Sequence, residues 1–384
     1  MSEWLEKRIS DIAEVIAGGT PSTTVSDYWD GGISWITPND LSSHKARYIS
    51  RGERNITEEG LKKSAAKLLP RNTLLLTTRA PIGYLAIAEK EISTNQGFKN
   101  LICDNSQIDC RFFYYYIKLN VEYFKAFATG ATFPELSGGT LKRIKVLIPD
   151  LPTQTRIAEI LSAYDDAIEN NNRRIALLEK AARELYREWF VRFRFPGYES
   201  AKFVNGLPEG WERTKFKGNI SYITGKLDSN EMIADGRYSF YTCAKVIYKT
   251  DSYCFDGECV LLGGNNATVD FSLFYANEKL DAYQRTYIVT PLNDRISCPY
   301  IYFVLVNYLQ AFKTSSTGAA TKFLTKRMLD NFYIILPPKD LSDEHYRISK
   351  ALFDERINLQ RQSQNHARQR NLLLPRLMSG KLEV

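Results

Sequence analysis

The stretch LIPDLPTQTRIAEILSAYDDAIENNN, from Leu147 to Asn172, decides the fold of this chain. It joins a short apolar strand to a long polar helix through Ile-Pro and Leu-Pro. Proline ends a strand and is tolerated in the first turn of a helix, so the junction is sharp. A related junction, IILPPKDLSDEHYRISKALFDERIN, runs from Ile334 to Asn358. A chain that makes the same strand-to-helix junction twice is predicted to contain two copies of one unit.

The two halves align at a constant offset over a long segment. Residues 110–149 fall on residues 298–337, an offset of 188 (298 − 110), without a gap over 40 positions. Average composition gives about two or three identities by chance. Ten are present in the first half, at Cys110, Tyr114, Phe124, Lys125, Thr129, Gly130, Ala131, Leu136, Leu141 and Pro149. The same offset places Leu74 on Leu262 and Gln96 on Gln284.

Nearer the start of each half the offset is 207 instead of 188. It places Trp4 on Trp211, Ile16 on Ile223 and Gly18 on Gly225. The first half therefore carries 19 extra residues (207 − 188) between Gly18 and Leu74. Agreement in spacing as well as in residue type indicates an internal duplication that has diverged.

Each half reads as the same succession of elements. Short β-like runs come first, NTLLLTT and YLAIAE in one half and CVLLGG and RTYIVTP in the other. An apolar helical stretch follows, then a polar loop with Thr-Gly-Ala, a strand and the long helix. This order predicts an α+β fold built twice, with an internal pseudo-twofold repeat.

The first long helix is predicted from Thr153 to Phe190, a span without proline or glycine. At 1.5 Å per residue it is roughly 57 Å long. Its apolar residues alternate in steps of four and three, which is a heptad pattern typical of a coiled coil. They are Ile157, Leu161, Tyr164, Ile168, Ile175, Leu178, Ala182, Leu185 and Trp189. Asn171 takes the remaining slot, either to fix the helix register or as a tolerated polar residue.

The second long helix is predicted over Leu341–Arg370, with Pro375 expected to disrupt it. At an offset of 191, Ile348, Leu352 and Leu359 repeat the first helix's apolar positions. Its later seam is polar, so it needs a partner that tolerates polar residues. The first helix, antiparallel, is one such partner, and another subunit is the alternative. Trp189 and Phe190, late on the first helix, suggest a surface that prefers partners.

Composition limits the function classes. The net charge is +7, with 51 Lys and Arg against 44 Asp and Glu, which is compatible with nucleic acid but also with many enzymes. No run of 18 apolar residues is present, and the start lacks the apolar core of a signal peptide. These features predict a cytoplasmic protein without a membrane span. The six cysteines show no metal-binding spacing and are expected to be reduced and buried.

Catalytic motifs are not found. The three histidines, His44, His345 and His366, have no nucleophile elbow near them. The segment GNISYITGK has the wrong spacing for a P-loop, and no GxGxxG follows a strand. The sequence therefore predicts a chain without catalytic residues, metal or cofactor.

Several short motifs, in their order along the chain, resemble one family. They are GGTPS (Gly18–Ser22), YWDGGISWITPNDL (Tyr28–Leu41), STNQGF (Ser93–Phe98), IPDLPTQTRIAEIL (Ile148–Leu161), FPGYES…GLPEGW (Phe195–Trp211) and LLPRLMSGKLEV (Leu373–Val384). Together with the duplication they resemble the specificity (S) subunit of type I restriction–modification systems over essentially the whole chain. The second half departs from the pattern, with GKLDS at Gly225–Ser229 and KDLSDEHYRI at the start of its helix.

The resemblance implies a non-catalytic reader of double-stranded DNA. Two target recognition domains, residues 1–152 and 196–340, would each bind one half of a split asymmetric sequence. The helices 153–195 and 341–384, as an antiparallel coiled coil, would set the unread gap. They would also dock two methyltransferase (M) subunits that carry the S-adenosylmethionine chemistry on adenine, with motor–nuclease (R) subunits joining them.

Candidate DNA contacts follow from the chemistry of readout, in which Arg or Lys pairs with guanine and Asn or Gln with adenine. Loop hydroxyls and lysines suit phosphate. The first-half candidates are Thr20, Ser22 and Thr23 for the DNA backbone and Arg79, Gln96 and Lys99 for bases. The second-half candidates are Lys226 and Lys322 for phosphate and Asn265, Asn266, Gln284 and Arg285 for bases.

Alternatives stay open at this stage. Gly263-Gly264-Asn265-Asn266 also has the composition of a turn, and a shared buried hydrogen bond explains the coincidence of Gln96 and Gln284 equally well. For the whole chain, the alternatives are a two-headed protein-binding scaffold without sequence-specific DNA recognition, and an enzyme with an unrecognised site.

Overall fold

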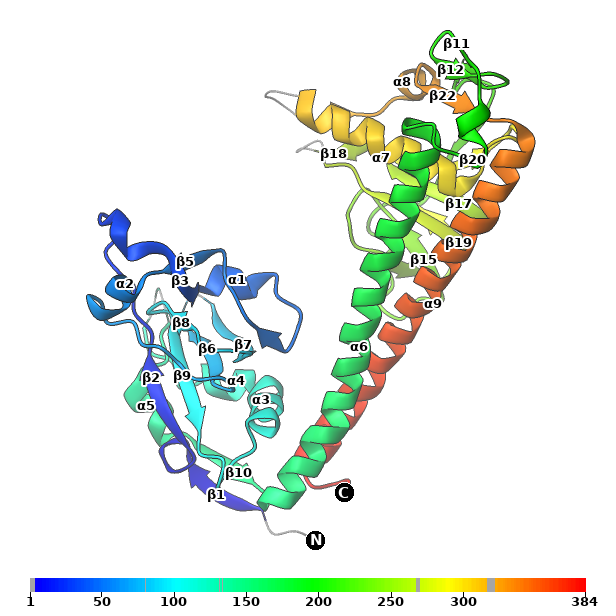
Figure 1. Ribbon diagram of the computed structural model, residues 1–384. Helices are drawn as coiled ribbons and strands as arrows, with labels where there is room; N and C mark the ends of the chain where they lie inside the picture. Colours follow the sequence, from blue (N-terminus) through cyan, green and yellow to red (C-terminus); the bar gives the residue numbers. More distant parts are fainter. Residues whose placement is uncertain (1–3, 80, 131, 133, 267–269, 316–321) are drawn as a thin grey trace. The chain divides into compact units, whose positions relative to one another are not determined.

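The computed structural model describes residues 4–79, 81–130, 132, 134–266, 270–315 and 322–384. The chain divides into two compact units, Met1–Arg173 with Gln360–Val384 (unit 1) and Arg174–Leu359 (unit 2). Two long helices, α6 (Leu151–Tyr186) and α9 (Lys339–Met378), contribute to both units (Figure 1). Each unit has a hydrophobic core of its own.

Unit 1 contains a five-stranded sheet in the order β2-β9-β6-β7-β4, a three-stranded sheet β5-β3-β8 and a separate pair β1-β10. The strands are β1 (Leu5–Arg8), β2 (Ala13–Ala17), β3 (Trp29–Ile36), β4 (Tyr48–Ile49), β5 (Arg54–Ile56), β6 (Leu74–Thr78), β7 (Ile82–Ala88), β8 (Ser93–Thr94), β9 (Phe98–Cys103) and β10 (Lys145–Ile148). The short helices are α1 (Pro38–Ser42), α2 (Glu58–Lys62), α3 (Cys110–Leu119), α4 (Val121–Lys125) and α5 (Gly138–Arg143).

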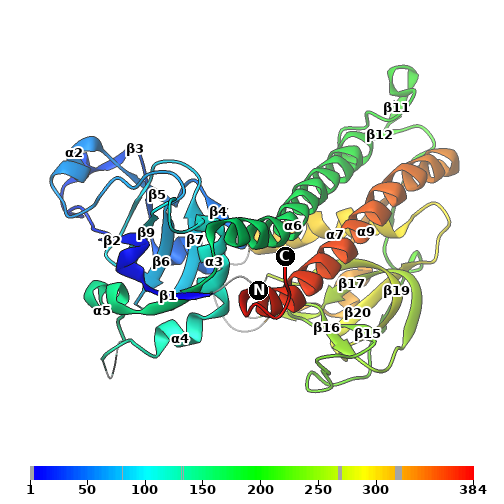
Figure 2. The same cartoon turned by 90° about the horizontal axis from the view of Figure 1, so that it is seen from below.

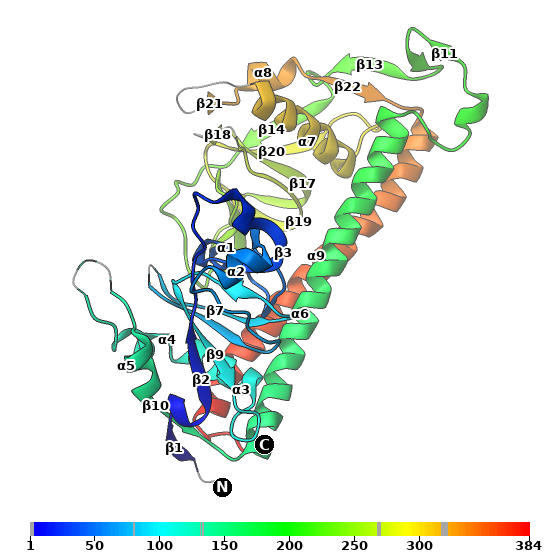
Figure 3. The same cartoon turned by 60° about the vertical axis from the view of Figure 1, so that its left-hand side comes forward.

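The core of unit 1 has two layers because the strands alternate their side chains between two buried faces. On β6, Leu74 and Leu76 share a cluster with α3, while Leu75 shares another with Leu41 of α1 and Phe98 of β9. The apolar side of α3 lies between this sheet and the ends of α6 and α9, all in one hydrophobic cluster. The five-stranded sheet can be followed in Figure 2, and its strands β2, β9 and β7 are also visible in Figure 3.

Unit 2 repeats this plan around a six-stranded sheet in the order β14-β20-β17-β19-β15-β16. Its strands are β11 (Phe203–Val204), β12 (Leu207–Pro208), β13 (Glu212–Lys215), β14 (Ile220–Thr224), β15 (Tyr238–Tyr241), β16 (Tyr248–Thr250), β17 (Phe255–Gly263), β18 (Asn265–Asn266), β19 (Leu273–Ala282), β20 (Thr286–Pro291), β21 (Lys322–Phe323) and β22 (Tyr333–Leu336). Its helices are α7 (Cys298–Ser315) and α8 (Lys326–Asp330). The mixed α/β architecture, built twice, is as the sequence predicted.

The strand registers confirm the duplication residue by residue. β1 pairs with β10 so that Leu5 faces Ile148, and β13 pairs with β22 so that Glu212 faces Leu336. Both members of that pair keep the offsets of 207 (212 − 5) and 188 (336 − 148). The starts of α3 and α7, at Cys110 and Cys298, also keep the offset of 188. Ala131 and the counterparts of residues 129–131, at 317–319, lie outside the described residues.

One predicted equivalence is wrong. Leu74 faces Leu101 across β6 and β9, whereas the residue that faces Val289, the counterpart of Leu101, is Val260. Leu74 therefore corresponds to Val260, at an offset of 186, and not to Leu262. The reason is periodicity, because a displacement of two residues returns an apolar side chain to the same face of a strand. Sequence alone cannot distinguish the two registers in a run of leucines.

The extra residues of the first half lie in one segment. β3 pairs in parallel with β8 at Ile36 and Thr94, and β15 pairs in parallel with β19 at Tyr241 and Ala282. Ile36 and Tyr241 thus correspond at an offset of 205 (241 − 36). Since the offset at Leu74 is 186, the 19 extra residues (205 − 186) lie between Ile36 and Leu74. This segment contains α1, α2, β4 and β5.

The junction before α6 is held by one buried side chain. Gln154 accepts a hydrogen bond from the Asp109 backbone N–H (2.9 Å) and donates to the carbonyls of Pro149 (2.9 Å) and Gln107 (3.2 Å). Asp109 in turn caps α3 by accepting from the backbone N–H groups of Arg111 and Phe112. Gln154 therefore ties the start of the long helix to the start of α3.

Unit 2 makes the same junction with different side chains. The Pro337 carbonyl, counterpart of that of Pro149, accepts from Arg295 Nε at 2.6 Å. The counterpart of Gln154 at the helix offset of 191 is His345, which is 1% exposed and packs edge-on against Phe190 with ring centroids 4.7 Å apart. Its Nε2 has no hydrogen-bond partner within the described part of the chain.

The long helices correct two sequence-based expectations. α9 continues through Pro375 to Met378. Proline removes one backbone hydrogen bond, but burial of Leu374, Leu377 and Met378 in the unit 1 core holds the last turn in place. α6 continues into a π-helical turn, η3 (Arg187–Val191).

Trp189 and Phe190 are not an exposed partner surface. They are 7% and 4% exposed and lie in the unit 2 core, where Phe190 packs against Trp211 and Tyr300. The expectation that all cysteines are buried is also wrong, since Cys254 is exposed. Among the described helices, none has the length and apolar character needed to cross a membrane.

The burial of His345 predicts a pH effect. Burial lowers the pKa of His345 from 6.5 to about 3. Between these values the unfolded chain binds a proton that the folded chain excludes, so the free energy of unfolding falls as the pH falls through this window. We expect His345→Gln, which installs the side chain found at the matching position of the first half, to flatten that slope.

Urea unfolding of the full chain at a series of pH values between about 4 and 7 measures this slope. His44→Gln is the control for removing a histidine elsewhere in the chain. An unchanged slope in the His345→Gln variant would contradict the expectation.

Candidate nucleic-acid interface

Three loop regions meet at one edge of the unit 1 sheet. β2 ends at Ala17, β6 ends at Thr78, and the neighbouring strand β9 begins at Phe98. Because β9 is antiparallel to both β2 and β6, these ends lie at the same edge. The predicted contacts of the first half all lie in or next to these loops.

Two tryptophans hold the loop of the Gly18–Ser22 motif through hydrogen bonds to its backbone. The indole N–H of Trp35 donates to the Gly19 carbonyl at 2.9 Å, and that of Trp29 donates to the Ser22 carbonyl at 3.0 Å. The two rings pack edge to face with centroids 5.1 Å apart. Ser22 and Thr23 are both exposed, and the Ser22 hydroxyl lies 2.8 Å from that of Thr24.

Gly18 is required where this loop crosses the turn before β9. A Cβ at Gly18 would lie 1.9 Å from the Asn95 carbonyl oxygen. The close approach brings Thr20 to Gln96, and the Thr20 hydroxyl donates to the Gln96 side-chain oxygen. Gln96 is exposed at the tip of its turn, so the alternative of a buried structural hydrogen bond fails for this residue.

Arg79 and Lys99 lie beside Glu135. Arg79 forms an isolated antiparallel bridge with Glu135, and Lys99 Nζ is 3.4 Å from the Glu135 carboxylate. The Lys99 side chain is only 12% exposed, whereas Arg79 is half-buried. Lys99 thus already has a carboxylate partner and little access to solvent, so Arg79 is the more accessible cation of the two.

Unit 2 builds the corresponding edge in the same way. A Cβ at Gly225 would lie 1.6 Å from the Ala282 carbonyl oxygen, so the loop after β14 also passes close to the turn before β20. Leu227 then bridges to Tyr283 and accepts a hydrogen bond from the Gln284 N–H at 3.0 Å. Because Leu227 follows Lys226, this hydrogen bond brings the backbone of Lys226 close to that of Gln284. Both residues are exposed.

The remaining second-half candidates gather on a short two-stranded ribbon. β18 pairs with β21, with Asn265 opposite Phe323 and Asn266 opposite Lys322. The exposed Arg285 guanidinium lies 5.7 Å from the Phe323 ring centroid. The chain bends at Gly264, between the end of β17 and the start of β18, while Asn265 and Asn266 themselves lie on the strand β18.

Arg79 and Asn265 occupy the same place in the two units. The Thr78 N–H donates to the Gly97 carbonyl, and the Gly264 N–H donates to that of Arg285, both at 2.8 Å. Likewise Leu136 N–H donates to Thr78 and Leu324 N–H to Gly264. Thr78 and Gly264 thus make equivalent backbone hydrogen bonds, and the residues that follow them are Arg79 and Asn265. One backbone arrangement thus presents a guanidinium in the first half and an amide in the second.

Some residues of this edge were not singled out from the sequence. Trp29, Trp35 and Glu135 hold the candidate contacts in place, and Asn95 accepts from the Gly97 N–H to close the turn below Gln96. The two tryptophans lie within the YWDGGISW motif, which marked this segment as part of the family pattern but did not show that they hold the loop. Within the described ranges, no group of three or more His, Cys, Asp or Glu side chains is arranged to hold a metal ion.

Comparison with known protein families finds a match over most of this chain. A family model described as "Type I restriction modification DNA specificity domain" matches residues 1–180 and 208–369. The chain belongs to the type I restriction modification DNA specificity family. The two matched segments coincide with the two copies of the duplicated unit.

Relatives of this specificity family match the whole chain or a part of it. The chain is 34% identical to the type I restriction enzyme MjaIX specificity subunit of Methanocaldococcus jannaschii, covering 100% of this chain and 94% of the relative. It is 32% identical to the EcoDI specificity subunit of Escherichia coli over 34% of this chain and 28% of the relative. A crystal structure of the type I S subunit from M. genitalium shares the fold, with a TM-score of 0.69, 16% identity and coverage of 98% and 96%.

The support of the Gly18–Ser22 loop yields a prediction. Trp35→Phe keeps most of the buried ring but leaves the buried Gly19 carbonyl without its donor. Leaving such a group unpaired costs about 1–3 kcal/mol. We expect urea unfolding to show a loss of this size. Tyr28→Phe, a half-buried aromatic of the same cluster, is the control and should change stability by less than about 0.5 kcal/mol. Equal losses in both variants would argue against a role for the indole hydrogen bond.

Proposed function

We propose that this chain is the sequence-reading, non-catalytic subunit of a type I restriction–modification complex, and that each unit reads one half of a split asymmetric DNA sequence. The observation that carries this proposal is the edge built twice. The same backbone hydrogen bonds hold Arg79 in one unit and Asn265 in the other. Family membership supplies the general role, and the two edges supply the residues.

The side chains at the two edges have the chemistry of base readout. Gln96 and Gln284 present exposed amides, which pair with adenine through its ring nitrogen and amino group. Arg79 suits guanine at the position where Asn265 suits adenine. Since equivalent positions carry different side chains, the two half-sites differ in sequence.

The flanking residues have the chemistry of phosphate binding. Ser22 and Thr23 offer exposed hydroxyls, and Lys226 offers an exposed cation next to Gln284. Thr20 positions Gln96 through its hydroxyl. Lys322 lies on β21 opposite Asn266 and completes the set in unit 2. Such contacts orient a protein on the duplex without reading its sequence.

The two proposed recognition domains span residues 1–152 and 196–340, and one long helix follows each of them in the sequence. We assign residues 153–195 and 341–384 to an antiparallel coiled coil that sets the unread gap between the half-sites. Supporting this, the heptad positions Ile157, Leu161 and Ala182 are buried, and Asn171 is only 5% exposed. The ring contacts fit antiparallel helices. Tyr164, early on α6, lies near His366, late on α9, whereas Trp189, in the turn η3 after α6, lies near His345, early on α9.

The chemistry in the complex belongs to other subunits. Two methyltransferase subunits would dock on the helices and methylate adenine with S-adenosylmethionine, and motor–nuclease subunits would add restriction. The chain itself contributes recognition. A complex that modifies chromosomal DNA works in the cytoplasm.

Co-expression tests this role. The chain and a type I methyltransferase subunit from the same locus are expressed in a host that lacks adenine methylation, and the DNA is sequenced for N6-methyladenine. One two-part motif, methylated on each strand and dependent on this chain, is expected. Assembly of the complex without any methylation would favour a protein-binding scaffold, and methylation by the purified chain alone would indicate an enzyme.

The same experiment tests Arg79. Arg79→Ala removes the paired donors that select guanine, so one position of one half-site should relax, at a cost of roughly 1–3 kcal/mol in binding. Asn265→Ala is the matched change and should relax one position in the other half-site. Relaxation of the same half-site by both variants would refute the assignment of one edge to each half.

A phosphate contact predicts a different signature. Lys226→Ala should weaken binding of the methyltransferase complex to all DNA sequences alike and reduce the slope of log K against log salt by about one unit. Titrations of target and scrambled duplexes at several salt concentrations measure both effects. Lys90→Ala, an exposed lysine on a turn of the other unit, is the control for general charge loss. Weakening confined to the target sequence would show that Lys226 reads a base.

A further inference from the structure

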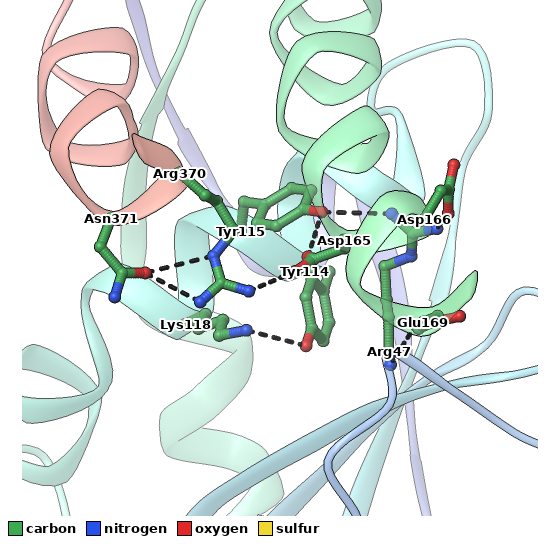
Figure 4. Close-up of polar contacts among 9 residues, drawn as sticks. All are labelled: Arg47, Tyr114, Tyr115, Lys118, Asp165, Asp166, Glu169, Arg370 and Asn371. Carbon is green, nitrogen blue, oxygen red and sulfur yellow. Dashed lines mark hydrogen bonds and ion pairs between the residues drawn. The ribbon is translucent and has the colours of Figure 1, made fainter. Parts of the chain in front are cut away.

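A buried ion pair joins α6 and α9 in unit 1. The Arg370 guanidinium of α9 donates to the Asp165 carboxylate of α6, and the two side chains are 15% and 8% exposed. The second oxygen of Asp165 accepts from the Tyr115 hydroxyl at 2.5 Å, and Arg47 donates to that hydroxyl at 3.1 Å (Figure 4). Because its carboxylate is held by both partners, Asp165 cannot turn towards solvent.

A second ion pair joins the same two helices in unit 2. The Arg356 guanidinium of α9 lies 3.4 Å from the Glu179 carboxylate of α6, with side-chain exposures of 10% and 46%. Arg356 also lies 4.9 Å from the Phe353 ring centroid and donates to the Tyr275 carbonyl at 3.5 Å. The cation is therefore fixed by burial, while the acid is half in solvent.

The duplication relates these two pairs and exchanges their charges. The helices repeat at an offset of 191, at which Ile157 corresponds to Ile348. The same offset carries Asp165 onto Arg356 (356 − 165) and Glu179 onto Arg370 (370 − 179). The two pairs therefore occupy equivalent places in the repeat, but α6 carries the acid in both and α9 carries the base in both.

The first part of the apolar seam does not distinguish α6 from α9. Its matching positions are occupied by Ile157 and Ile348, Leu161 and Leu352, and Ile168 and Leu359. Further along, the seams differ, because Ile175 and Leu178 of α6 correspond to the polar His366 and Gln369 of α9. At the shared apolar positions, a rule for choosing the partner must come from the neighbouring charged residues.

The ion pairs supply such a rule. If two α6 helices from separate chains paired in the observed register, Asp165 of each would face Glu179 of the other. If two α9 helices paired, Arg356 would face Arg370, also twice. Like charges held close together in a partly desolvated seam are strongly unfavourable, whereas α6 with α9 forms two opposite-charge pairs.

A third pair points in the same direction. Arg174 of α6 lies 2.7 Å from Glu355 of α9 in unit 2. At the offset of 191 its counterparts are Asn365 and Tyr164, so self-pairing of either helix would lose this attraction. Both side chains are substantially exposed, so this pair contributes little beside Asp165–Arg370 and Glu179–Arg356, in which the cation is mostly buried.

We propose that the ion pairs Asp165–Arg370 and Glu179–Arg356 make α6 selective for α9 and reject a second copy of α6, and that they make α9 reject a second copy of α9. Each pairing of these helices then brings together one first-half domain and one second-half domain. Pairs with two identical recognition domains are excluded by charge. This device goes beyond DNA reading, and it holds whichever DNA sequence the two units recognise.

Exchange of one ion pair in the full-length chain tests the proposal. E179R/R356E keeps opposite charges between α6 and α9 in unit 2 but makes each helix self-complementary. In a pair of α6 helices, Asp165 could face the arginine introduced at position 179, and in a pair of α9 helices, Arg370 could face the glutamate introduced at position 356. E179A/R356A is the matched control, because it removes the same pair without creating any attraction between identical helices. Both variants and the unchanged chain are refolded from urea at high protein concentration, and their masses are measured by light scattering on a sizing column.

We expect the unchanged chain and E179A/R356A to give the mass of one chain, 44.0 kDa, and E179R/R356E to give an additional species of twice that mass. The same mass distribution for E179R/R356E and E179A/R356A would overturn the proposal, as would an equal amount of the doubled species in the unchanged chain. Circular dichroism melts check that each variant folds. If E179R/R356E does not fold, E179K/R356D takes its place, with a shorter acid at the buried position.

A second measurement does not depend on refolding. Each variant is co-expressed in one cell with two different affinity tags and purified over both in turn. Recovery of doubly tagged material is expected to rise at least tenfold for E179R/R356E over E179A/R356A. Equal recovery from the two would count against charge selection.

Discussion

The structure depends on satisfying one buried carbonyl in each half. Pro149 and Pro337 end the strands that lead into the long helices, and both are buried. A proline carbonyl taken out of water needs a donor, since leaving it unpaired costs about 1–3 kcal/mol. Gln154 supplies that donor in unit 1 and Arg295 supplies it in unit 2. Both side chains also bind a neighbouring backbone segment, so the direction in which each helix starts is tied to its own domain.

The two edges show how a duplicated unit diverges without losing its frame. Several backbone hydrogen bonds recur in both units, and in each unit a glycine passes close to a neighbouring turn, so the loops stay in place. The side chains that this backbone carries differ between the units. Arg79 and Asn265 are one result, on equivalent backbone positions with different hydrogen-bonding groups. A protein that reads two different half-sites needs this separation between a fixed frame and variable contacts.

The helices show the same division between shared and distinct features. The first part of their apolar seam matches in both copies, which is what a common origin of the halves leaves behind. Their paired charges differ in a correlated way, with acids on α6 and bases on α9. Apolar contact is non-directional and gives stability to any similar pair, whereas charge gives sign and therefore choice. In this chain, stability and partner choice come from different residues of one interface.

The sequence by itself determined the duplication, the strand-to-helix junctions, the long helices and the mixed α/β class. These features depend on local periodicity, proline chemistry and spacing, all of which are visible along the chain. It did not determine that Leu74 corresponds to Val260, that Pro375 leaves α9 unbroken, or that Trp189 and Phe190 are core residues. Each of those depends on which distant segment packs against the residue. The edge was partly predictable, because the candidate residues lie in loops that do converge, but the roles of Trp29, Trp35 and Glu135 were not. Only the tertiary structure places the hydrogen bonds between segments far apart in the sequence, and those bonds decide which side chains support the edge and which remain free to bind.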